Sequence, residues 1–144
     1  MAHELQNALA ELGGTSGLGR RIRSGEDMQA AIREGFPQTA LLRVMERSSL
    51  TLKEIAESLD LSPRSLQRRR DGRLAPAESD RLYRLARMIG LARFQIGDDE
   101  GALRWLKQKN PALGGRVPLA CLDTEPGARE VENVLGRIGY GGVS

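Results

Sequence analysis

Apolar residues recur along this chain at the spacing of helices rather than of strands. Between residues 51 and 59 the stripe is regular, with Leu52, Ile55, Ala56 and Leu59 at i, i+3, i+4 and i+7, which places their side chains on one helix face. The same spacing recurs twice further along the chain, at Leu82, Leu85, Ala86 and Ile89 and at Val131, Val134, Leu135 and Ile138. No segment shows the alternation that is typical of strands. The pattern therefore predicts an all-α fold.

Capping residues indicate where these helices begin and end. Thr51 and Glu54 have the spacing of a capping box, and Ser62 precedes a proline that can occupy a first helical position. The same kinds of signal occur elsewhere: starts at Ser24, Pro37 and Pro76, a break at 97–99, a turn-rich connector NPALGGRVP, a short helix from Pro118 to Leu122, and a final helix over about 127–136.

These signals divide the chain into three parts. Residues 1–24 hold apolar positions for one short helix and then the run GGTSGLG, so we expect this segment to be flexible or weakly structured. Residues 25–97 are predicted to form a helix-turn-helix domain. Residues 98–144 are predicted to form a second, small helical domain.

The stretch 51–70, TLKEIAESLDLSPRSLQRRR, has the features of a DNA-binding helix-turn-helix. In this motif two short helices cross steeply, and the second enters the major groove. Ala56 is small where the helices meet, Leu66 faces inward, and Asp60 occupies the turn, where a left-handed backbone is needed. The alternative interpretation is an αα-hairpin with a solvated basic face.

Positive charge is concentrated in and after the second helix of this motif. The chain has a net charge of +3, and residues 61–75 contain five arginines but only one acid, Asp71. The residues expected to face base edges, at which arginine reads guanine and glutamine reads adenine, are Arg64, Ser65, Gln67, Arg68 and Arg69. Arg70 and Arg73 are expected to contact phosphates, which add affinity without sequence choice.

Composition argues against several other classes of protein. One cysteine, Cys121, and one histidine, His3, offer neither a disulfide nor a zinc site, and no nucleophile with a base can be assembled. We therefore expect no catalysis, no metal and no cofactor. The chain has no apolar run of the roughly 20 residues that a membrane span needs, and its first residues lack the pattern of a signal peptide. A cytoplasmic protein is expected.

Three further stretches resemble the Xre/MbcA/ParS antitoxins, the antidote half of type II toxin–antitoxin pairs. The first is LAPAESDRLYRLARM, directly after the arginine helix. The second is ALRWLKQKNPALGGRVPLACLDTEPG, with the family's Trp-Leu, Asn-Pro, Gly-Gly and Thr-x-x-Gly. The third is the ending, VENVLGRIGYGGVS. With the helix-turn-helix, the likeness covers about residues 35–144.

The resemblance implies a protein with two partners, operator DNA and a toxin. The N-terminal domain would repress the chain's own operon. The C-terminal domain would bind a RES-type toxin, an enzyme that degrades NAD⁺ or in some relatives ADP-ribosylates proteins, and would occlude its active site. Homodimers within a larger toxin–antitoxin complex are also implied. The toxin-binding residues expected on this basis are Arg137, Ile138, Gly139, Tyr140 and Gly141.

Two alternatives remain open from the residues alone. The C-terminal end could be a frayed helix whose Tyr140 covers part of the core. The whole chain could also be a stand-alone helix-turn-helix regulator whose C-terminal domain only forms dimers.

Overall fold

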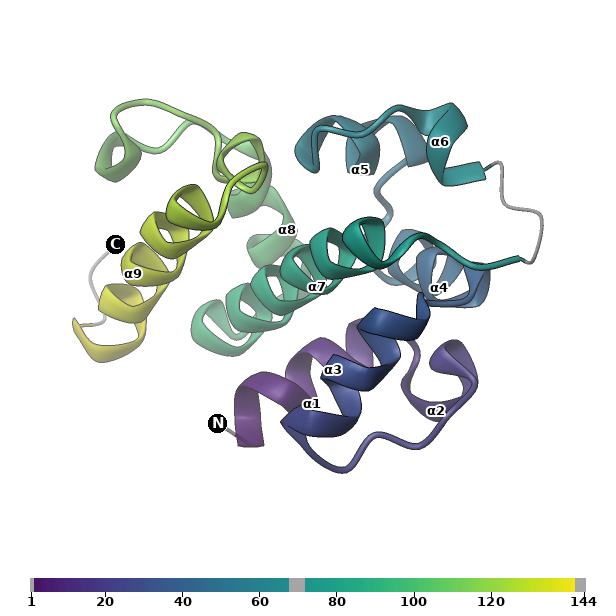
Figure 1. Ribbon diagram of the computed structural model, residues 1–144. Helices are drawn as coiled ribbons and strands as arrows, with labels where there is room; N and C mark the ends of the chain where they lie inside the picture. The colour runs from purple at the N-terminus through teal and green to yellow at the C-terminus, as the bar shows by residue number, and fades with distance from the viewer. Residues whose placement is uncertain (1, 68–71, 142–144) are drawn as a thin grey trace.

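The chain folds into an assembly of helices around one long central helix (Figure 1). The computed structural model describes residues 2–67 and 72–141. Within these ranges every regular element is a helix, which confirms the all-α prediction. The elements are α1 (Ala2–Glu11), α2 (Gly14–Leu18), α3 (Gly25–Glu34), α4 (Gln38–Ser48), α5 (Leu52–Ser58), α6 (Pro63–Gln67), α7 (Pro76–Ile96), α8 (Asp99–Lys107), η1 (Pro111–Leu113), η2 (Pro118–Cys121) and α9 (Glu125–Gly141).

Most helices begin at the caps that the sequence predicts. The Ser24 hydroxyl accepts a hydrogen bond from the Asp27 backbone amide at 3.2 Å and starts α3. Pro76 is the first residue of α7, and Gly97 ends that helix with a φ of 80°, a left-handed conformation that glycine adopts without strain. Helix α9 also starts near the predicted residue, but it is longer than predicted because it continues to Gly141.

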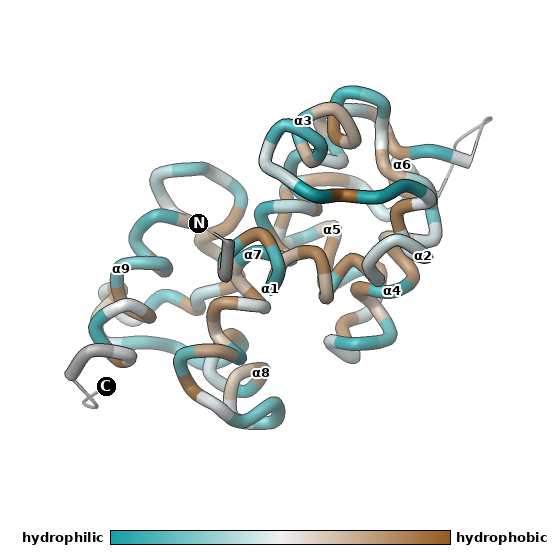
Figure 2. Tube along the Cα trace, turned by 90° about the horizontal axis from the view of Figure 1, so that it is seen from below, coloured by the Kyte–Doolittle hydropathy of each residue, from teal (hydrophilic) through white to brown (hydrophobic). Residues whose placement is uncertain are grey.

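Helix α7 organises the rest of the molecule. It has 21 residues, and it packs against α1, α3 and α4 on one side and against α8 and α9 on the other (Figure 1). Its fully buried Leu85, Met88 and Ile89 belong to one apolar core to which residues from α1 to α9 all contribute. In Figure 2 the apolar stretches of α1, α5 and α7 lie toward the middle of the molecule. The two predicted domains are thus built on a shared helix.

The N-terminal segment is not weakly structured, and the expectation for residues 1–24 is wrong in this respect. Helix α1 lies along α7, and its Ala8 and Leu12 are fully buried. The contact is close because Gly90 has no side chain: a Cβ at that position would lie 2.8 Å from the Cβ of Asn7 and 2.9 Å from its carbonyl carbon. A local sequence window cannot reveal this partner, which lies some eighty residues away.

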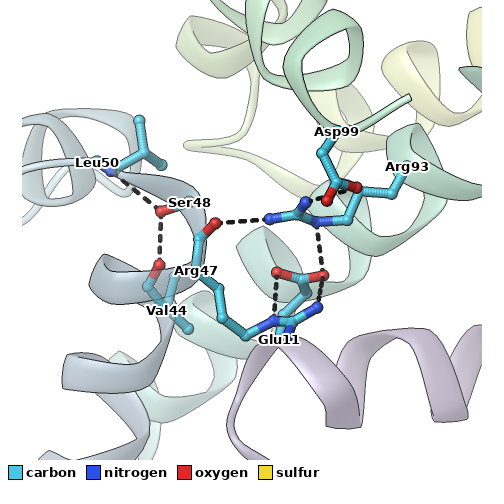
Figure 3. A network of polar contacts seen from close by, with 7 residues as sticks. All are labelled: Glu11, Val44, Arg47, Ser48, Leu50, Arg93 and Asp99. Atoms are coloured by element: carbon cyan, nitrogen blue, oxygen red, sulfur yellow. Dashed lines mark hydrogen bonds and ion pairs between the residues drawn. The ribbon is translucent and has the colours of Figure 1, made fainter. Parts of the chain in front are cut away.

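A buried carboxylate joins three parts of the molecule (Figure 3). The side chain of Glu11, at the end of α1, is only 2% exposed and forms ion pairs with two arginines. Its oxygens lie 2.8 Å from Nε of Arg93 and 3.3 Å from Nε of Arg47. Arg93 also donates to the carbonyl oxygen of Arg47 at 2.7 Å and pairs with Asp99 at 2.9 Å. One network therefore connects α1, α4, the end of α7 and the start of α8.

The described helices include none that combines the length and the apolar character of a membrane-crossing segment.

Candidate functional sites

The first helix of the predicted DNA-binding motif begins at the capping box that the sequence indicates. Thr51 Oγ1 accepts from the Glu54 backbone amide at 3.1 Å, and Glu54 Oε1 accepts from the Thr51 amide at 2.9 Å. The other Glu54 oxygen lies 3.6 Å from Nζ of Lys107 on α8. The pKa of Glu54 lies below its ordinary value, mainly because the Thr51 amide donates to the carboxylate and also because Lys107 is near. The carboxylate therefore stays charged and caps α5 at neutral pH.

The turn between α5 and α6 has the geometry of a helix-turn-helix. Asp60 has a φ of 56°, which confirms the left-handed residue expected there. The amide of Leu61 donates to the carbonyl oxygen of Ala56 at 2.8 Å, and Nη1 of Arg81 donates to the carbonyl oxygens of Leu59 and Asp60, both at 3.3 Å. Sequence reasoning missed Arg81, because no local pattern links a residue of α7 to this turn.

The second helix of the motif, α6, presents Arg64 to solvent. The Ser62 hydroxyl accepts from the Ser65 amide at 3.0 Å and caps the helix as predicted. Leu66 is 1% exposed and faces the core, and its carbonyl oxygen accepts from the side-chain amide of Gln38 at 2.8 Å. Arg64 is exposed. The helix is thus held from behind with an arginine on its outer face.

Two of the DNA-binding candidates make hydrogen bonds within the fold. The Ser65 hydroxyl donates to Oε2 of the buried Glu78 at 2.6 Å, so this side chain faces α7 rather than a groove. Arg73 donates from Nη1 to the carbonyl oxygen of Gly35 at 2.9 Å, and its side chain is partly buried. Ser65 thus ties α6 to α7, and Arg73 is tied to the residue that ends α3.

The remaining DNA-binding candidates cannot be placed in the same way. Gln67 is the last residue of α6, and its side chain lies outside the described part of the chain. Arg68, Arg69 and Arg70 fall within 68–71, also outside the described residues.

In the C-terminal part, the small and polar residues of the family-like motif form tight turns. Oδ1 of Asn110 accepts from the amide of Ala112 at 2.9 Å and caps η1, and Gly114 and Gly115 follow with φ values of 67° and 84°. Thr124 Oγ1 accepts from the amide of Gly127 at 3.1 Å at the start of α9. A Cβ at Gly127 would lie 2.0 Å from the carbonyl oxygen of Cys121. The spacing Thr-x-x-Gly therefore reflects a cap followed by a position that only glycine fits.

The end of α9 carries the predicted toxin-binding residues. Arg137 and Gly139 are exposed, whereas Ile138 is partly buried and packs against the core. Gly139 lies against the side chain of Gln95, and a Cβ there would be 1.9 Å from its Oε1. The backbone stays helical through Tyr140 and Gly141, but the Tyr140 side chain lies outside the described part. The predicted residues thus form the last turns of a helix that is anchored on α7.

The two candidate sites are well separated. Helix α6 and the C-terminal end of α9 lie on different sides of the molecule in both Figure 1 and Figure 2.

Neither a catalytic nor a metal centre stands out in the described residues. No group of three or more His, Cys, Asp and Glu side chains with metal-binding geometry occurs among them. Cys121 is buried, and burial raises the pKa of its thiol, so the reactive thiolate is disfavoured. The fold defines an all-α protein with a helix-turn-helix in its N-terminal part.

Comparison with known proteins identifies both domains. Residues 27–87 match the antitoxin Xre-like helix-turn-helix domain, and residues 91–141 match the antitoxin Xre/MbcA/ParS C-terminal toxin-binding domain. Among relatives named antitoxin Xre, one from Yersinia enterocolitica is 34% identical over 127 residues, covering 86% of each chain. One from Pseudomonas putida is 33% identical over 83% of this chain and 77% of its own length. One from Photorhabdus laumondii is 34% identical over 84% of each chain. The chain belongs to the Xre family of toxin–antitoxin antitoxins.

Proposed function

We propose that this chain neutralises a RES-type, NAD-degrading toxin by occluding the entrance of its active site with the C-terminal end of α9. It represses its own operon through the helix-turn-helix, and it works in the cytoplasm as a homodimer within a larger toxin–antitoxin complex. In this proposal the chain acts by binding and catalyses no reaction. The proposal rests on the family membership together with the geometry of α9.

The observation that carries the proposal is the packing of the last turns of α9 against the rest of the fold. Ile138 holds this end on the core, and Gly139 lies against Gln95, while Arg137 is exposed. A guanidinium on a preordered helix can bind carboxylates or phosphates without a large ordering cost on binding. A site that binds a dinucleotide commonly holds a carboxylate for a ribose hydroxyl, and Arg137 could pair with such a carboxylate. The helix end is therefore suited to enter an active site and to block it.

Deletion of residues 139–144 tests this occlusion. The deletion leaves Ile138 and the whole described core in place, so the truncated chain should unfold at nearly the same temperature as the full chain and should still bind DNA. Co-expressed with the toxin, the full chain should keep cellular NAD⁺ high, whereas the truncated chain should not.

Two other outcomes would count against the proposal. If the truncated chain protects NAD⁺ as well as the full chain does, the end of α9 is not the occluding element. If neither chain binds a RES-type toxin but both bind the promoter, the protein is a stand-alone regulator with a dimerisation domain.

A further inference from the structure

A groove of about 560 Å³ lies beside the end of α9, where this helix meets α8 and the end of α7. Its apolar lining residues come from all three helices: Ile96 from α7, Trp105 from α8 and Ile138 from α9. Each of these side chains is partly buried and packs against the core. Trp105 thus packs against the core and also forms part of an open surface.

The more exposed polar residues form the rim of the groove, and they include one cation. Arg104 is exposed and forms no ion pair or hydrogen bond with any residue in the described part of the chain. Gln95 and Gln108 also line the rim. The carboxylate of Asp98 already accepts the amide of Gly101 at 2.8 Å as the N-cap of α8. Partly buried apolar residues beside more exposed polar ones are a common arrangement at protein–protein interfaces.

We propose that this groove is a second docking surface for the toxin, and that it receives an apolar side chain from a segment that also carries an Asp or Glu for Arg104. The inference rests on the proposed function. Every residue that lines the groove lies within 91–141, the part that matches a toxin-binding domain. The groove is also continuous with the occluding end, because Ile138 belongs to both. Tryptophan and arginine are among the residues most enriched at binding hot spots.

Two neighbouring surfaces of the chain would then have different functions. The groove supplies affinity, because it buries apolar area and pairs a charge, and the end of α9 supplies inhibition, because it blocks the active site. Loss of the groove should therefore weaken binding, whereas loss of the end should release activity in a complex that still forms.

Trp105 itself offers a direct readout, because the chain contains only one tryptophan. Antitoxin labelled with 5-fluorotryptophan should give one ¹⁹F resonance, which reports on the groove alone. Titration with an unlabelled, catalytically inactive RES-type toxin should shift or broaden this resonance. The same change is expected in the chain that lacks residues 139–144, because the groove is intact there.

A matched pair of charge reversals tests the rim. Arg104→Glu should weaken toxin binding about tenfold or more without a change in unfolding temperature, because Arg104 has no partner in the described fold. Arg129→Glu is the control: Arg129 is exposed on α9 and lies outside the groove, and among the described residues its only ion-pair partner is Glu125, at a long 3.9 Å. This control should leave the affinity within about twofold, as expected for a residue outside a hot spot.

Failure of this inference differs from failure of the proposed function. If toxin binds but the ¹⁹F resonance stays unchanged and Arg104→Glu binds as tightly as the unaltered chain, the groove is not a docking surface, and the proposed function stands. If the unaltered chain binds no RES-type toxin, the proposed function itself is wrong.

Discussion

Arginine has two distinct roles in this protein, and they differ in where the guanidinium lies. Arg81 and Arg73 donate to backbone carbonyl oxygens of the helix-turn-helix turn and of the loop before α4. Arg84 likewise donates from Nη1 to the carbonyl oxygen of Leu122, directly after η2, at 3.0 Å. The planar group with five donors suits such carbonyl-rich loops. Part of the positive charge near the DNA-binding helix therefore stabilises the fold, and Arg64 is the described candidate that remains exposed.

Arg64→Ala should lower affinity for the operator by about 1–3 kcal/mol, the discrimination that one bidentate arginine–guanine contact provides. The free energy of unfolding should not change, because the side chain is exposed. Gel retardation or fluorescence anisotropy with operator and unrelated duplexes measures the effect. Arg137→Ala serves as the control, because it removes an exposed arginine from the distant end of α9. An equal loss on both duplexes would indicate a phosphate contact instead, and an unchanged affinity would exclude Arg64 from the interface.

At the scale of elements, the sequence predicts what local chemistry decides. The caps at Thr51 and Ser62 and the left-handed turn at Asp60 all depend on residues within a few positions, so the helix-turn-helix could be predicted closely. The length of α9 could not. Glycine commonly ends a helix, and Gly136 suggested that end, but Ile138 packs back on the core and the helix continues. The groove around Trp105 was equally hidden, since three separate helices form it.

Gly90→Ala tests the packing of α1 on α7. Alanine favours an isolated helix by up to about 1 kcal/mol, yet here its Cβ would contact the backbone of Asn7 at 2.9 Å. The helices must move apart, so we expect a net destabilisation of about 1–3 kcal/mol, measured by chemical denaturation. Gly136→Ala is the matched control, because a Cβ at this position of α9 meets nothing within 4 Å, and it should be neutral or stabilising. Equal behaviour of the two variants would contradict close packing at Gly90.

At the scale of the whole molecule, the two functional parts are not independent bodies. The matched domains end and begin within α7, which spans Pro76–Ile96, and their apolar residues form one core. The polar contacts of Lys107 with Glu54 and of Arg93 with the carbonyl oxygen of Arg47 also cross from one part to the other. We infer that the predicted DNA-binding and toxin-binding surfaces keep a fixed relative orientation.

Among the polar contacts described, the network around Glu11 should contribute most to cooperative unfolding of the two parts. Glu11→Ala removes a carboxylate that is 2% exposed and leaves Arg93, itself only 13% exposed, without its main charge partner. Breaking a buried ion pair costs about 3–5 kcal/mol, and because α1, α4, α7 and α8 meet here, the loss should appear as one cooperative transition at lower denaturant. Glu34→Ala is the control: it removes an exposed carboxylate, 57% accessible, from its 2.9 Å pair with Arg20 and should cost less than about 1 kcal/mol. Two separate transitions in Glu11→Ala, monitored by the fluorescence of Trp105 and by circular dichroism, would show instead that the two parts unfold independently.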